Sequence, residues 1–155
     1  MNLISHRGNT NGPEPDIENR PEVILSLIDK KIAVEIDLRW HNSRFYLGHD
    51  EPQYEISSEF LLKNRDWLWV HCKEKNSFEE ALKLRRLNCF WHDTDDYTMT
   101  SFGYVWAYPG KKPVGSLCVA VMPERCWTPE ETLKKCFFAV CTDEINQYSE
   151  ILNSK

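Results

Sequence analysis

Short apolar segments recur along the chain, and polar stretches separate them. Each segment has the length typical of a β-strand, and several are rich in valine, isoleucine, cysteine or aromatic residues. We therefore predict strands over residues 3–6, 32–40, 67–73, 89–93, 104–108, 117–122 and 137–142.

Amphipathic patterns between these segments predict helices. Residues 22–30 carry apolar side chains at helical spacing, and Pro21 precedes them in a position that suits the first turn. Thr128 followed by Pro129 is typical of a helix start, with threonine as the N-cap. Two further helices are expected over residues 77–87 and about 144–152.

The alternation of strands and helices indicates βαβ units, a parallel sheet and the α/β class. The chain of 155 residues has no evident linker or tandem repeat, so we predict a single domain over residues 1–155. Two architectures fit this order of elements: an open doubly wound sheet and a closed barrel. No glycine-rich turn follows the first strand, so the sequence lacks a nucleotide-binding fingerprint.

Composition and charge narrow the classes of partner. The formal net charge of -5 argues against a nucleic-acid-binding surface. No apolar stretch approaches the roughly 20 residues of a membrane-spanning helix, so no membrane span is expected. The 6 cysteines form no CxxC pair, and the first residues lack a secretory signal core. We interpret most of them as buried thiols in a cytoplasmic protein, whose oligomeric state the sequence leaves open.

Side chains capable of chemistry cluster where the predicted strands end. His6, Asp37, Lys73, His92 and Asp143 each lie near the end of such a strand or just beyond it. Because the carboxyl ends of parallel strands meet at one edge of a sheet, these side chains are expected to converge there.

The strand over residues 32–40 places two carboxylates on one face. Residues two apart in a strand share a face, so Glu35, Asp37 and Arg39 point the same way, as do His71 and Lys73 on the following strand. Two buried carboxylates need a compensating cation, and Mg²⁺ or Ca²⁺ prefers oxygen ligands. The alternative without a metal is a salt-bridge layer in which Arg39 or Lys73 neutralises the carboxylates.

Several histidines favour a functional site over a simple salt-bridge layer. His6, His49 and His71 are expected in the same region as the paired carboxylates, and such clusters of titratable groups are typical of active sites. His92 begins a second cluster that continues to Asp96. A substrate-facing role for His92 and a purely structural role for this cluster are equally compatible with the sequence.

Four short motifs in the first fifty residues resemble those of the glycerophosphodiester phosphodiesterase family. The family pattern reads HRG, PEN, E-x-D and HD, and the chain carries His6-Arg7-Gly8, Glu18-Asn19, Glu35-Ile36-Asp37 and His49-Asp50 in that order. Ile17 replaces the proline of the second motif. His71-Cys72-Lys73 resembles the E-x-K strand end of the family, with histidine in place of glutamate, and the resemblance fades beyond this point.

This resemblance implies a fold and a hydrolase activity. The expected fold is a compact, reduced TIM-like (β/α) barrel of about seven to eight parallel strands, as in the wider PI-PLC-like phosphodiesterase superfamily. The implied site binds one divalent cation, expected to be Mg²⁺ or Ca²⁺ with Mn²⁺ as the alternative. The resemblance makes Glu35 and Asp37 its ligands, with His71 at a third ligand position and Glu18 as a further ligand or an orienting group.

The resemblance also assigns catalytic roles. His6 and His49 would form the acid-base pair, while Arg7 and Lys73 would bind the phosphate of a small, glycerophosphodiester-like substrate. His92 is the remaining candidate for substrate binding.

Two departures from the family keep other functions open. His71 removes one negative charge from the metal site, and imidazole suits transition metals better than Mg²⁺ or Ca²⁺. The chain is also shorter than the roughly 250 residues typical of a TIM barrel. The alternatives are a non-catalytic barrel domain that binds phosphate or metal, a related phospholipase-type phosphodiesterase, and a structural α/β interaction domain.

Overall fold

The computed structural model describes residues 1–154, and it confirms the predicted α/β class. Parallel strands lie side by side through most of the sheet, and each coincides with one of the strands expected from the sequence. Across the sheet they are β6 (Asn88–Phe90), β5 (Leu68–Cys72), β2 (Ala33–His41), β1 (Asn2–His6), β10 (Ala139–Thr142), β9 (Cys118–Val121) and β8 (Val105–Ala107).

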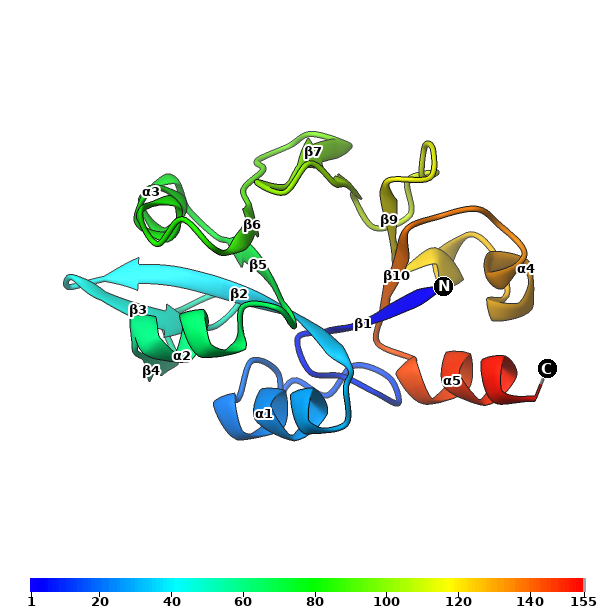
Figure 1. The fold of residues 1–155 in the computed structure, drawn as a ribbon, viewed down its shortest axis with the longest axis horizontal. Helices are drawn as coiled ribbons and strands as arrows, with labels where there is room; N and C mark the ends of the chain where they lie inside the picture. Colours follow the sequence, from blue (N-terminus) through cyan, green and yellow to red (C-terminus); the bar gives the residue numbers. More distant parts are fainter. Residues whose placement is uncertain (155) are drawn as a thin grey trace.

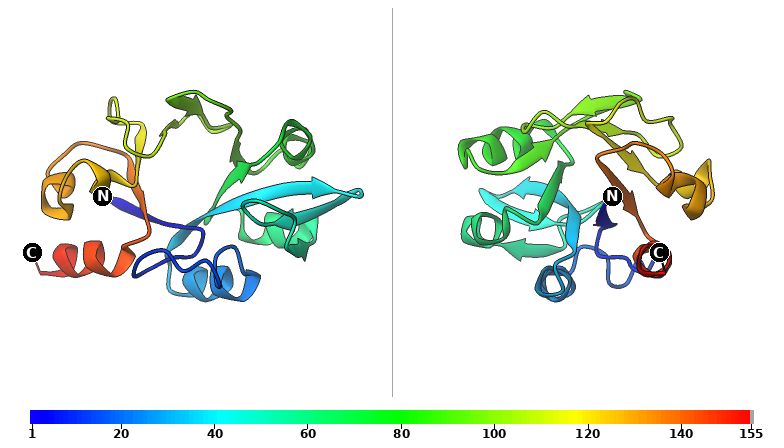
Figure 2. Two further views of the ribbon diagram at one scale, coloured as in Figure 1. Left: turned by 180° about the vertical axis from the view of Figure 1, so that it is seen from behind. Right: turned by 45° about the vertical axis from the view of Figure 1, so that its right-hand side comes forward.

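The expectation of a closed barrel of parallel strands is wrong. The 10-stranded sheet is curled (Figures 1 and 2), but it also contains the antiparallel strands β3 (Arg44–Leu47), β4 (Tyr54–Ile56) and β7 (Tyr97–Met99). Within residues 1–154, no ladder joins β6 to β7 or β8. The chain between β6 and β8 forms β7 instead of a crossover helix, so no complete βαβ unit brings β8 against β6.

Ser101 bridges part of this opening between β6 and the strands that follow it. Its backbone N–H donates to the carbonyl oxygen of Cys89 at 2.8 Å, and its hydroxyl accepts from the Cys89 N–H at 3.0 Å. The same hydroxyl donates to the carbonyl oxygen of Leu87 at 2.7 Å. A loop therefore satisfies backbone groups that a neighbouring strand would satisfy in a closed barrel.

Helices cover the outside of the sheet on the sides away from β7 (Figure 1). Four of them match the predicted helices: α1 (Pro21–Asp29), α3 (Lys75–Lys83), α4 (Pro129–Leu133) and α5 (Ile145–Asn153). The start of α4 follows from a capping box, because the Thr128 hydroxyl accepts from the Glu131 N–H and the Glu131 carboxylate accepts from the Thr128 N–H.

Helix α2 (Ser58–Asn64) was not predicted, and its local signal is weak. The hydroxyl of Ser57 caps it by accepting from the Phe60 N–H at 3.1 Å. The helix buries Leu61 and Asn64 but is too short to show a clear helical period in the sequence.

Side chains alternate between an apolar and an acidic face along β2. Val34, Ile36 and Leu38 are fully buried on the face of β2 that packs with Ile24 and Leu27 of α1. The side chains of Glu35 and Asp37 alternate with them, as predicted for a strand.

A second core cluster draws on several strands of the curled sheet. It includes Ile4, Trp69, Phe90, Trp106 and Val121. Cys72, Cys89, Cys118 and Cys141 are buried on strands, as the sequence predicts for small apolar side chains. Among the helices of residues 1–154, none has the length and apolar character needed to cross a membrane.

Candidate active site at the carboxyl ends of the strands

The carboxyl ends of the parallel strands surround a cavity of about 270 Å³, here called the carboxyl-end cavity. Seven residues predicted from the sequence line it: His6, Arg7, Glu35, His49, His71, Lys73 and His92. Asp93, Trp106, Tyr108, Pro109 and Val121 complete its walls. The predicted convergence of chemically capable strand ends is therefore confirmed in the structure.

His6, the last residue of β1, is fixed by a carboxylate from the other end of the chain. Its Nδ1 lies 2.8 Å from Oδ1 of Asp143, which follows β10, while its Nε2 lies 3.9 Å from Oε2 of Glu35. The contact with Asp143 orients the ring and leaves Nε2 to exchange protons. Burial opposes protonation, but the hydrogen bond to Asp143 and the charge of Glu35 outweigh it, so the pKa of His6 is raised.

Asp143 remains ionised beside His6. Burial would raise the pKa of this carboxyl group, but the hydrogen bond and charge of His6 lower it below the ordinary value. Asn9 donates a second hydrogen bond to Asp143 Oδ1 at 2.8 Å. The same amide nitrogen lies 2.9 Å from Oε1 of Glu18, so Asn9 links the two carboxylates.

Arg7 turns sharply away from the end of β1 and pairs with a buried carboxylate. Its φ of 56° lies in the left-handed region, which is strained for a residue with a side chain. Its Nε lies 2.9 Å from Oδ2 of Asp37, and its Nη1 lies 3.2 Å from Oε2 of Glu18. A strained backbone that presents a charged side chain is common at functional sites.

Asp37 is completely buried and has several cationic partners, although its Oδ1 accepts no hydrogen bond. Besides Arg7, it has Lys73 Nζ 3.3 Å from its Oδ1, and the Asn19 amide donates to its Oδ2 at 2.9 Å. Burial opposes its ionisation, but contact with His71 and the charges of Arg7 and Lys73 hold the pKa of Asp37 far below its usual range. This aspartate therefore stays ionised in the folded protein.

Glu35 is as deeply buried as Asp37 but has fewer partners. It is 1% exposed, and its Oε2 has no hydrogen-bond partner. Its nearest cationic groups are imidazoles, with His71 Nδ1 at 3.5 Å from Oε1 and His6 Nε2 at 3.9 Å from Oε2. A buried carboxylate in this position requires a cation to offset its desolvation.

Glu35, Asp37 and His71 form a group that could hold a metal ion. One potential ligand atom from each residue lies within 4.8 Å of the others. Two carboxylates and one imidazole suit a divalent cation, and the unpartnered Glu35 oxygen supports this fit. Without a metal, a proton can take part of this role: burial opposes it, but Asp37 and Glu35 together raise the pKa of His71.

Glu18 is not part of this three-residue group in the described chain. Arg7 and Asn9 engage its two carboxylate oxygens, so its position fits an orienting residue better than a metal ligand. Arg39 also lies apart from the paired carboxylates, although the strand pattern placed it on their face. It pairs with Glu74 at 3.2 Å instead.

Arg39 holds the loop that carries His49. Its Nε donates to the carbonyl oxygen of Gly48 at 3.0 Å, and its Nη2 donates to the carbonyl oxygen of His49. Gly48 has a φ of 150°, and a Cβ there would lie 2.1 Å from the carbonyl oxygen of Glu51. Only glycine fits this turn, which delivers His49 to the cavity.

The His49 side chain is partly exposed and pairs with its neighbour. Its Nδ1 lies 2.7 Å from Oδ1 of Asp50, which resembles the arrangement of His6 with Asp143. Both histidines line the carboxyl-end cavity, and each has one ring nitrogen held by a carboxylate. This arrangement could serve acid-base chemistry from two sides of one ligand.

His92 is stacked within the wall of the cavity. Its ring lies 4.8 Å from the ring of His71 at an angle of 9°, and His71 in turn stacks on Phe90 at 5.0 Å. Burial and the nearby charges of His71 and Lys73 lower the pKa of His92. His92 therefore faces the cavity as a neutral ring, and it restrains the orientation of His71.

The supporting roles of three residues became evident only from the structure. Asn9 was not identified as a candidate, Asn19 was recognised only as part of a motif, and Asp143 only as a polar strand end. Asn19 has a φ of 60°, and it both accepts from the Asp37 N–H and donates to the Asp37 carboxylate. The available signals were the asparagine of the second motif and a carboxylate after the last strand.

Glu124, in the 3-10 helix η1 (Pro123–Arg125), is expected to lower stability at neutral pH. Its Oε1 accepts from the Thr142 hydroxyl at 2.9 Å, but its Oε2 is buried without a partner. Burial raises the pKa of Glu124, so its ionisation opposes folding, and this penalty disappears as the pH falls below the ordinary glutamate range. Glu124→Gln should therefore raise Tm at neutral pH but leave it unchanged near about pH 4.

Thermal unfolding followed by circular dichroism measures this difference. The matched control is Glu51→Gln, at an exposed loop position, which should leave Tm unchanged at both pH values. A lower Tm for Glu124→Gln at neutral pH would show that the carboxylate stabilises the fold there.

Comparison with known proteins identified no relative of this chain. No family model matches the chain, and neither the curated proteins nor the solved structures give a match. A functional assignment therefore depends on the geometry and chemistry of the carboxyl-end cavity.

Proposed function

We propose that the protein is a metal-dependent phosphodiesterase that hydrolyses a small phosphodiester in the carboxyl-end cavity. The observation that carries the proposal is the group of Glu35, Asp37 and His71, in which Oε2 of the deeply buried Glu35 and Oδ1 of Asp37 both lack a hydrogen-bond partner. A salt-bridge layer accounts for Asp37, which has two cationic partners, but it leaves Glu35 poorly compensated. The order of the motifs in the sequence supports the same reaction.

The cavity has the charges needed to bind a phosphodiester. Arg7 and Lys73 line it, and both can donate hydrogen bonds to anionic phosphate oxygens. Their pairing with Asp37 fixes their positions before a ligand binds. A volume of about 270 Å³ favours a compact substrate, such as a glycerophosphodiester with a small alcohol group.

A divalent cation held by Glu35, Asp37 and His71 would supply positive charge to the phosphate group. Arg7 and Lys73 add to that charge and lower the repulsion between the anionic phosphate and an incoming oxygen nucleophile. One of His6 and His49 removes a proton from that nucleophile, and the other protonates the departing alkoxide. Asp143 and Asp50 keep the two rings oriented during these transfers.

Glu35→Gln is expected to separate metal binding from folding. The variant keeps the shape of the side chain but removes a ligand charge, so binding of Mg²⁺, Ca²⁺ or Mn²⁺ should weaken by more than roughly tenfold. At a pH above the range in which His6 and His71 titrate, the metal-free protein should be at least as stable as before, because Glu35 Oε2 has no hydrogen-bond partner to lose and its charge no longer pairs with protonated histidines. Isothermal titration calorimetry and thermal unfolding measure these two effects.

The matched control is Glu55→Gln. Glu55 forms an exposed ion pair with Arg44 at 2.8 Å, so its replacement should change neither metal affinity nor stability by much. Unchanged metal affinity in Glu35→Gln would place the ion elsewhere. A marked loss of stability in the metal-free Glu35→Gln protein would favour a salt-bridge layer instead.

Activity is tested with a panel of glycerophosphodiesters, with each of the three metals and with a chelator. The proposal expects metal-dependent release of a phosphomonoester that the chelator abolishes. The lack of release from folded protein with every metal would reject hydrolysis of these substrates. Metal or phosphate binding without turnover would then support a non-catalytic binding domain, for which the replacement of a carboxylate ligand by His71 is the favouring observation.

A further inference from the structure

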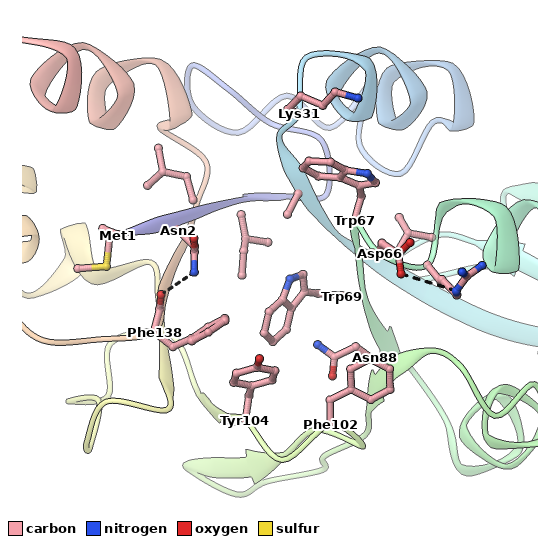
Figure 3. Close-up of a pocket in the computed structure, with 15 residues that line it drawn as sticks. Met1, Asn2, Lys31, Asp66, Trp67, Trp69, Asn88, Phe102, Tyr104 and Phe138 are labelled. Carbon is pink, nitrogen blue, oxygen red and sulfur yellow. Dashed lines mark hydrogen bonds and ion pairs between the residues drawn. The ribbon is translucent and has the colours of Figure 1, made fainter.

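A second cavity, of about 490 Å³, lies at the amino ends of the parallel strands (Figure 3). We call it the amino-end cavity. The starts of β1, β2, β5 and β6 contribute to its lining, so it lies at the opposite end of the sheet from His6 and Lys73. Its volume falls within the roughly 300–1,000 Å³ typical of small-molecule sites.

Aromatic side chains form one wall of the amino-end cavity. The ring centres of Tyr104 and Phe138 lie 4.2 Å apart. The ring centre of Trp69 lies 5.2 Å from that of Tyr104 and 6.1 Å from that of Phe138. Figure 3 shows the three rings next to one another. Contiguous aromatic faces of this kind favour a planar ligand that can stack against them.

Asn88 supplies a polar group among these rings. It begins β6, pairs with Trp69 of β5, and is 5% exposed. Its Oδ1 is buried without a hydrogen-bond partner, and its amide lies toward Trp69 and Tyr104 in Figure 3. A buried amide oxygen without a partner is unfavourable, so a ligand that donates a hydrogen bond to it would gain affinity.

The charged side chains of the amino-end cavity are already engaged with protein groups. Arg65 Nε lies 3.6 Å from Oδ1 of Asp66, and Lys31 Nζ lies 5.6 Å from the centre of the Trp67 ring. Both contacts lie toward solvent, whereas Oδ1 of Asn88 is buried among the rings. Among the side chains that line this cavity, Asn88 is therefore the main one with an unsatisfied hydrogen-bonding group.

We propose that the amino-end cavity binds a small, neutral, planar molecule with an amide-like edge, which carries a hydrogen-bond acceptor beside a donor. The edge pairs with the amide of Asn88, which itself offers one donor and one acceptor group in a plane. The planes of Trp69 and Tyr104 are inclined by 54°, so the ligand stacks on one of these rings and meets the other with its edge. This site is separate from the proposed phosphodiesterase site, and either can be correct without the other.

The test uses 2-quinolone, a fused-ring lactam, and its N-methylated form, which has the same rings but lacks the donor. Titration of ¹⁵N-labelled protein is followed by NMR through the indole N–H signals. Saturable shifts are expected for Trp67 and Trp69, which line the cavity, and not for Trp40 and Trp127, which do not. N-methylation should weaken binding by roughly tenfold, the effect of losing one good hydrogen bond.

Asn88→Leu provides the complementary test on the protein. The variant keeps the side-chain size but removes the amide, so its affinity for 2-quinolone should fall by roughly tenfold and the two probes should then bind equally. The lack of saturable shifts up to the solubility limit of 2-quinolone would overturn the proposal. Equal affinity of the two probes for the unmodified protein would overturn the role of Asn88, and this comparison does not depend on the folding of any variant.

Discussion

His6→Ala is expected to lower the rate of metal-dependent phosphodiester hydrolysis by about a hundredfold to ten-thousandfold. The variant removes a ring that lies at the cavity surface between Asp143 and Glu35. Loss of a general acid or base leaves substrate and metal binding largely in place, so kcat should fall much more than KM rises. Steady-state kinetics on the best substrate of the panel gives both values.

His41→Ala is the matched control for this loss. His41 is the exposed last residue of β2, and its ring lies 6.3 Å from the ring of Tyr46, outside the carboxyl-end cavity. Its replacement should leave kcat and KM unchanged. If His6→Ala retained the full rate, the assignment of acid-base chemistry to this cavity would be incorrect.

Asp37→Asn is expected to reduce the free energy of unfolding by about 3–5 kcal/mol. The variant leaves Arg7 and Lys73 without their shared buried counter-ion and disturbs the hydrogen bonds with Asn19. Because the pKa of Asp37 is held far below its usual range, the charged form is the one that the fold stabilises. For a protein of this length, the change corresponds to a fall in Tm of roughly 10 °C.

Chemical denaturation of the metal-free protein measures this effect, and Asp66→Asn is the matched control. Asp66 also forms an ion pair, with Arg65, but its side chain is 76% exposed, so the loss should be less than about 1 kcal/mol. A similarly small loss for Asp37→Asn would mean that the buried ion pairs contribute little. The contrast with Glu35→Gln, which should not destabilise the metal-free protein, distinguishes the structural carboxylate from the one that needs a metal.

The positions of the regular elements were largely predictable from the sequence. Strand β2 is an example: its alternation of apolar and acidic residues placed Val34, Ile36 and Leu38 in the core and Glu35 and Asp37 on the other face. The start of α4 was equally clear, because its capping residues lie within one turn of each other. Such features depend on interactions between residues that are close in the sequence, so a short sequence pattern predicts them.

The closure of the sheet was not predictable in the same way. A closed barrel and an open curled sheet can have the same order of strands along the chain. They differ in whether β6 forms hydrogen bonds with β8. The replacement of a crossover helix by β7 decides this outcome. Tyr97 and Met99 of that strand are exposed, so the segment carries no strong apolar signal.

The sequence by itself determined which residues bring chemistry to the carboxyl ends of the strands: His6, Glu35, Asp37, His71 and Lys73. The tertiary structure decided how they are partnered, because partners come from segments far apart in the chain. The ring of His6 contacts Asp143, which lies 137 residues further along the chain. Arg39 was expected beside the carboxylates, but it binds the loop that carries His49. It also decided that Asp37 pairs with Arg7 and Lys73 while Glu35 lies beside histidines, since that difference depends on the distances between side chains rather than on their order along the chain.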